Sequence, residues 1–150
     1  MKKDELVGLD TNVLIYADDP SSVLHPAARG VLEEVFRGLW RACISPQILA
    51  EYYSVITSVK RCKNPLSAEE AKERVVWLNR VRILKKIYPR RSVLRRSVEF
   101  CAQKDIRGPR IFDVVYGITL LDYGVRRLKT NNVKDFLVFE KLGLNPEPLA

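Results

Sequence analysis

The chain has 150 residues, a length that fits a single domain, and such a chain buries about 68–70% of its unfolded surface. Its cysteines, Cys43, Cys62 and Cys101, are odd in number and far apart, which argues against a disulfide framework or a zinc knuckle. The formal net charge is +8 and the pI is about 9.6, which indicates an anionic partner. No apolar stretch is long enough to be a signal-peptide core or a membrane span, so we expect a soluble, cytoplasmic protein without a membrane partner.

The predicted elements alternate between strands and helices along the chain. In chain order they are a strand over 5–9, a short helix from about 11, a helix over 25–39, a strand over 41–45, helices over 46–61 and 65–81, a strand over 82–88, helices over 92–104 and 109–124, a strand over 126–130, and a short helix over 133–143 with a C-terminal tail. Ser67 followed by Glu70 predicts a capping box. Helical spacing places Val59 on the apolar face of the 46–61 helix. The alternation indicates one α/β domain over residues 1–150, with a parallel sheet covered on both faces.

The positive charge is concentrated in one segment, RVRILKKIYPRRSVLRR, residues 80–96, which we call the basic belt. The belt has eight basic residues and no acid, so it alone carries a charge of +8. The phosphate backbone of nucleic acid is the commonest intracellular ligand of such a segment. The alternative is a solvated face on an otherwise ordinary protein.

Three acids occupy positions where a carboxylate is costly. In a parallel sheet, ligands bind outside the carboxyl ends of the strands. Asp10 follows the first strand, Glu51 lies in the first turns of the helix after the second strand, and Asp113 lies in the first turns of the 109–124 helix. We therefore expect the three to converge at this edge of the sheet.

Each acid also has a structural explanation when taken alone. Asp10 is a suitable helix N-cap, Asp113 complements a helix dipole, and Glu51 falls on a polar stripe that would face water. Gly117 follows Asp113 by four residues, and a glycine inside a helix costs about 1 kcal/mol relative to alanine. Room beside the Asp113 carboxylate would be a reason for that glycine.

Converging acids would need a cation to neutralise their repulsion. Mg²⁺ or Mn²⁺ suits a shell of carboxylates and water, whereas one histidine and scattered cysteines do not make a typical zinc site. We interpret the histidine, His25, as the first residue of a helix.

The segments GLDTNVLIYA, SPQILAEYYSVI and RIFDVVYGITLLDYGVRRLKTNNVKDF resemble, in order and spacing, the motifs of PIN-domain ribonucleases, especially the VapC toxins of toxin–antitoxin pairs. The resemblance runs from about Leu6 to Phe136. It implies a three-layer α/β sandwich around a central parallel sheet, and an acidic Mg²⁺ or Mn²⁺ pocket that hydrolyses single-stranded RNA. It also implies a homodimer and a cognate antitoxin that blocks the pocket.

The same resemblance assigns roles to individual residues. Asp10 becomes a metal ligand, and Glu51 and Asp113 become the acids of the second and third motifs. Thr11, Asn12 and Thr130 support the site. RNA contacts are expected in the basic belt, at Arg90, Arg91, Arg95 and Arg96.

The last motif departs from the family pattern. Many relatives place an acid two residues after the threonine, where this chain has Asn132, and the next acid is Asp135. An amide supplies a neutral oxygen, which puts a second metal ion in doubt. Asp135 then either contributes to the site through water or only caps the following helix.

Two other functions remain open from the sequence. One is a non-catalytic RNA-binding or regulatory domain. The other is a phosphatase of the haloacid-dehalogenase type, which the LDTN segment suggests, although Asn12 stands where that family needs its second acid.

Overall fold

The structure, a computed structural model, describes residues 4–150 and is built on one five-stranded parallel sheet. The strands are β1 (Leu6–Leu9), β2 (Arg41–Ile44), β3 (Leu84–Lys86), β4 (Arg127–Lys129) and β5 (Asn145–Glu147), in the spatial order β3-β2-β1-β4-β5. β1 is central and reads as a short apolar run because both of its faces are covered. The predicted parallel α/β sheet is confirmed.

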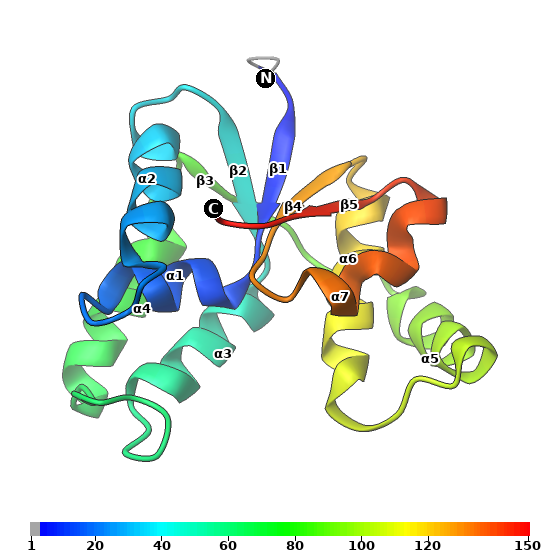
Figure 1. Cartoon of the computed structure of the whole chain (residues 1–150). Helices are drawn as coiled ribbons and strands as arrows, with labels where there is room; N and C mark the ends of the chain where they lie inside the picture. The colour runs from blue at the N-terminus through cyan, green and yellow to red at the C-terminus, as the bar shows by residue number, and fades with distance from the viewer. Residues whose placement is uncertain (1–3) are drawn as a thin grey trace.

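The helices form two groups beside the sheet (Figure 1). They are α1 (Thr11–Asp18), α2 (His25–Phe36), α3 (Pro46–Ile56), α4 (Ala68–Arg80), α5 (Val93–Lys104), α6 (Ile111–Asp122) and α7 (Val133–Phe136), with 3₁₀ turns over Gly108–Arg110 and Leu137–Leu142. α1 to α4 pack on one side, and α5, α6 and α7 lie on the other (Figure 1). This arrangement is the predicted sandwich of a parallel sheet between helical layers.

Local signals behave largely as the sequence predicts. Ser67 and Glu70 form the capping box at the start of α4, with both reciprocal hydrogen bonds present. His25 begins α2, and its Nδ1 lies 2.8 Å from the Tyr16 carbonyl oxygen. Gly124, at φ +72°, follows the end of α6 in the left-handed conformation that glycine adopts freely.

Two predictions about the elements are wrong. α3 ends at Ile56 rather than at 61, and Val59 lies outside the helix with 82% of its surface exposed. The chain turns there because the Leu66 N–H donates to the Ile56 carbonyl oxygen, which folds the loop back on the helix end. The C-terminal tail is not irregular, since it forms β5 beside β4.

All strands run in one direction, so their carboxyl ends share one edge of the sheet. α1, α3 and the loop that leads to α7 begin at this edge, directly after β1, β2 and β4. None of the helices in residues 4–150 combines the length and apolarity that a membrane crossing needs.

Candidate active site

Asp10 is the first residue after β1 and is held by three hydrogen bonds. It is 6% exposed and caps α1, because its Oδ1 accepts from the Thr11 N–H at 2.7 Å. Its Oδ2 accepts from the Thr130 hydroxyl at 2.7 Å and from the Asn12 amide at 3.2 Å. Burial raises the pKa of Asp10, while the hydrogen bonds from Thr130 and Thr11 oppose the rise. The capping interpretation is therefore correct, and it leaves the carboxylate fixed at the sheet edge.

Thr130 and Asn12 are themselves positioned by neighbouring strands and loops. The Thr130 N–H donates to the Glu147 carbonyl oxygen of β5 at 2.9 Å. The Asn12 side-chain oxygen accepts from the Asn131 N–H at 3.0 Å. Both residues thus have the supporting contacts with Asp10 that we expected of them.

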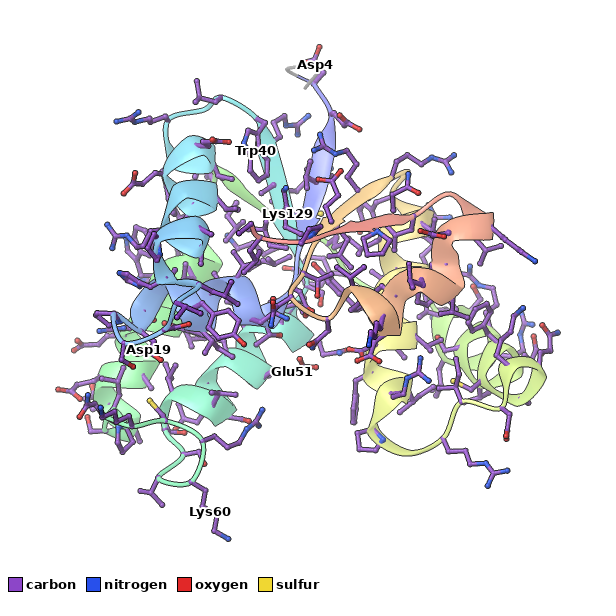
Figure 2. All side chains as sticks on the ribbon, in the orientation of Figure 1. Asp4, Asp19, Trp40, Glu51, Lys60 and Lys129 are labelled. Atoms are coloured by element: carbon purple, nitrogen blue, oxygen red, sulfur yellow. The ribbon has the colours of Figure 1, made fainter. Side chains whose placement is uncertain are left out.

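Glu51 lies on the second turn of α3 and points to the same edge of the sheet. Its Oε2 accepts from the Thr11 hydroxyl at 2.8 Å, and its Oε1 accepts from the Gln47 amide at 2.8 Å. Figure 2 shows the labelled Glu51 side chain near the centre of the molecule, between the two groups of helices. Glu51 does not simply face water, as the alternative interpretation would have it, because its carboxylate accepts a hydrogen bond from Thr11, the residue after Asp10.

Asp113 lies in the first turn of α6 and carries a carboxylate whose pKa is raised. Within residues 4–150, no hydrogen bond reaches its side-chain oxygens. Burial raises the pKa of Asp113 to about 7, and the charges of Asp10, Asp135 and Glu51 contribute in that order. A positive charge placed among these acids would lower their energy.

Gly117 does not provide room beside Asp113, so that prediction is wrong. The glycine is buried against the ring of Phe139, where a β-carbon would come within 2.6 Å of two ring carbons. The ring stacks on Phe100 with centroids 5.2 Å apart. The glycine is therefore explained by close packing of α6 on the C-terminal segment.

The three acids line one open cleft of about 310 Å³, together with Thr11, Asn12 and Asn132. The sequence did not single out Arg61 and Phe112, which also line this cleft. Phe112 is 55% exposed and adjoins Asp113, whereas Arg61 comes from the loop after α3. Arg61 lies in a loop that the sequence predicted as helix, so no local signal pointed to the cleft.

Asn132 and Asp135 are placed differently. Asn132 lines the cleft, and its backbone N–H donates to the Thr130 hydroxyl at 2.9 Å. Asp135 lies in the first turn of α7, where its Oδ1 is 3.8 Å from the Arg110 Nε. It makes no capping hydrogen bond within the described chain, and its charge nevertheless reaches Asp113. This favours an electrostatic contribution over the capping alternative.

The basic belt is partly engaged in ion pairs. The Arg96 guanidinium pairs with the Asp122 carboxylate through both terminal nitrogens, and Arg90 donates to the Asp122 carbonyl oxygen at 3.3 Å. Arg95 pairs with Glu99 at 3.1 Å. Asp122 is nine residues after Asp113 on α6, which is about 13 Å along the helix. RNA contact at these arginines and at Arg91 stays a prediction, and Arg96 is the least available of them.

The oxygen donors of the cleft are of the kind that hard divalent cations bind. Carboxylate and amide oxygens are the usual ligands of Mg²⁺ and Mn²⁺, and the unpartnered Asp113 carboxylate lies among like charges. Across residues 4–150, no three acidic, histidine or cysteine side chains are yet close enough to hold an ion together. The residues therefore have the right chemistry, and a bound ion would need the carboxylates to draw closer.

The sequence is similar to that of a characterised ribonuclease. It is 27% identical over 134 residues to ribonuclease VapC24 of Mycobacterium tuberculosis, covering 89% of this chain and 91% of the relative. No protein-family model matches the chain.

Solved structures share the fold. One is VapC20 of Mycobacterium tuberculosis, described as a toxin that cleaves the sarcin–ricin loop, with a TM-score of 0.64 at 12% identity over 81% of this chain and 86% of that one. Another is VapBC-1 of nontypeable Haemophilus influenzae, with a TM-score of 0.64 at 17% identity over 96% of this chain and 98% of that one. The resemblance that the sequence motifs indicate is thus confirmed in both sequence and fold.

Proposed function

Because the chain resembles the VapC-type PIN-domain ribonucleases in sequence and has their fold, we propose that it is a metal-dependent ribonuclease and the toxin of a toxin–antitoxin pair. The observation that supports this best is the cleft itself. Asp10, Glu51 and Asp113 come from three separate elements and line one open hollow, where burial and then the charges of nearby acids raise the pKa of Asp113. We propose single-stranded RNA as the substrate.

Asp10 and Asp113 would hold the principal Mg²⁺ or Mn²⁺ ion, and Glu51 would complete or orient its shell. When bound, such an ion polarises the phosphoryl oxygens and makes a water more acidic. Three hydrogen bonds fix the orientation of Asp10, and Thr11 fixes Glu51 relative to it. Glu51 is then available to take a proton from the attacking water. Asn132 supplies a neutral oxygen to the same cleft, and Asp135 adds negative charge from outside it.

Two residues at the cleft would position the RNA beside the acids. Arg61 offers a cation for a phosphate at the opening of the cleft. Phe112 offers an exposed ring on which an unpaired base can stack. Their presence next to an acidic centre gives RNA attractive contacts where the carboxylates alone would repel it.

We also propose an antitoxin partner and a homodimer. A groove of about 430 Å³ between α1, α2 and α4 is lined by Phe36 and Trp77, and the Trp77 side chain is 56% exposed. Asp18 and Arg74 pair at 2.9 Å within it, so it presents both apolar and charged surface to an antitoxin. A second apolar hollow between α3 and α4 includes Tyr53, which suits contact between copies of the chain.

The test is cleavage of single-stranded RNA by the purified protein in Mg²⁺ or Mn²⁺. We expect cleavage that EDTA abolishes and that the protein encoded next to this gene inhibits. Cleavage that survives thorough chelation would contradict the metal-dependent mechanism. Binding without cleavage would favour the regulatory domain, and phosphate release from monoesters would favour a phosphatase.

A further inference from the structure

A basic surface that includes the first half of the basic belt lies along the outer edge of the sheet, outside the acidic cleft. β3 is the last strand on its side, and a cleft of about 370 Å³ runs along it. We call this cleft the edge groove. Its basic lining residues come from the start of β2, the end of α4, the turn after α4 and β3 itself, and they are Arg41, Arg80, Arg82, Lys85 and Lys86.

The edge groove holds these cations without neutralising them. No acid is among its lining residues, and the ion pairs of residues 4–150 include none of the five. Lys86 is held in place because its Nζ donates to the Val81 and Leu84 carbonyl oxygens at 2.6 and 2.7 Å. Like charges gathered on one surface repel one another, and a polyanion would remove that repulsion.

Protection of an exposed strand edge explains only part of this charge. Lysines on an edge strand prevent pairing with another chain, and Lys85 and Lys86 serve that purpose. Arg41 and Arg80 lie on neighbouring elements and make no such contribution. Protection of the strand edge therefore does not explain why Arg41 and Arg80 line the same groove.

The sheet register places the edge groove close to the acidic cleft. Lys85 pairs with Cys43 on β2, and Cys43 pairs with Gly8 on β1. Two strand spacings separate Lys85 from Gly8, about 10 Å, and Gly8 precedes Asp10 by two residues. A strand of RNA that lies in the groove is therefore within a few nucleotides of the acids.

The groove also contains an aromatic side chain. Tyr88 is 56% exposed, and its backbone N–H donates to the Tyr123 hydroxyl at 3.2 Å, which fixes the chain where the ring projects. Cations that follow a backbone, combined with an exposed ring, are the features of single-strand binding surfaces. An acidic protein would satisfy the cations but would leave the ring without a base to stack on.

We propose that the edge groove binds the phosphate backbone of the single-stranded RNA that the acidic cleft cuts, with Tyr88 stacking on an unpaired base. This inference rests on the proposed function for the identity of the ligand. It adds a binding surface outside the cleft, and it gives Arg41 a role that the sequence did not suggest.

Binding is measured with protein that carries Asp113→Asn, so that the RNA stays intact. The groove variant adds Arg41→Gln, Arg80→Gln and Arg82→Gln, three exposed positions that make no ion pair in the described chain. The probe is an unstructured, dye-labelled RNA oligonucleotide, titrated at several salt concentrations. Each lost phosphate contact should flatten the plot of log K against log salt by about 0.7, so we expect a total change of about 2. At 0.1 M salt the affinity should fall on the order of a hundredfold.

The matched control removes the same charge elsewhere, through Arg37→Gln, Lys104→Gln and Lys141→Gln, which are also exposed. If both triple variants lose affinity equally, only net charge matters and the groove proposal is wrong. Unchanged RNA binding by the groove variant would also overturn it. Should the triple variant not fold, Arg41→Gln and Arg82→Gln are tested singly, each with an expected slope change of about 0.7.

A further variant, Tyr88→Leu, separates stacking from charge. We expect weaker binding with an unchanged salt slope, since no phosphate contact is lost. An unchanged affinity would refute the stacking contact. Failure of the ribonuclease proposal would look different. The parent chain would then leave RNA uncut, whether or not the groove variants bind RNA more weakly.

Discussion

Replacement of Asp113 by asparagine should stabilise the metal-free protein while removing its response to metal. The pKa of Asp113 rises from 3.8 to about 7 on folding, because of burial and of the charges of Asp10, Asp135 and Glu51. A shift of about 3 units corresponds to roughly 4 kcal/mol at 1.36 kcal/mol per unit. The side chain is only partly buried, and solvent screening reduces this to about 2 kcal/mol.

The sign of the pH dependence follows from proton binding. Between about pH 4 and pH 7 the folded protein holds a proton on Asp113 that the unfolded chain has released. The free energy of unfolding therefore falls as pH rises through this window, and it stays low above pH 7. In Asp113→Asn this decrease in the free energy of unfolding should be absent. The variant and the parent should have equal stability near pH 4 and should differ by about 2 kcal/mol at pH 8.

The assay is thermal unfolding in EDTA from pH 4 to pH 8, repeated with Mg²⁺ at pH 8. A difference of about 2 kcal/mol should appear as a Tm higher by about 4–8 °C for the variant at pH 8. Mg²⁺ at a hundred times its Kd should stabilise the parent by about 2.7 kcal/mol and the variant by much less. Asp4→Asn, which removes the same charge at an exposed position, is the control. Parallel pH profiles for Asp113→Asn and the parent would refute the reasoning.

Two further substitutions test the packing and the last motif. Gly117→Ala should destabilise the protein by about 1–3 kcal/mol in chemical denaturation, because the new methyl group would clash with the Phe139 ring. Gly30→Ala, in α2 with open space beside it, should instead stabilise by about 0.5–1 kcal/mol, and a similar gain at Gly117 would contradict the packing argument. Asn132→Asp should tighten Mn²⁺ binding in calorimetric titration, because it places a fourth negative charge in the cleft. No change in Mn²⁺ affinity would show that this side chain contributes nothing to the ion.

The acids of the site could be predicted because topology alone brings them together. Asp10 and Glu51 follow strands whose hydrophobic patterns are clear, and parallel strands end at one edge of the sheet. Asp113 starts a helix that returns to the same edge. These positions depend on the order of the elements, which the alternating pattern reveals, and not on the details of any side chain.

Other parts of the site depend on contacts that leave no local pattern. β5 contains Asn145 and Pro146, residues that are rare in strands, yet it pairs with β4 along its length. Backbone pairing with β4 is accompanied by long-range ion pairs, in which Glu147 meets Arg127 at 2.6 Å and Lys129 at 3.1 Å. Sequence spacing does not show such pairs, so the strand was missed.

The missed strand bears directly on the chemistry at Asp10. The Thr130 hydroxyl donates to the Asp10 carboxylate, and the Thr130 backbone N–H donates to the Glu147 carbonyl oxygen of β5. Asn132 follows on the same short loop and donates its N–H to the same Thr130 hydroxyl. Through Thr130, β5 therefore contributes to the orientation of the Asp10 carboxylate. It also contributes to the position of Asn132, the amide that stands where many relatives have a fourth acid. The departure from the family pattern at Asn132 lies in a loop whose backbone is held by hydrogen bonds to Thr130 and Asn12, so we expect its effect to fall on the charge of the cleft rather than on its shape.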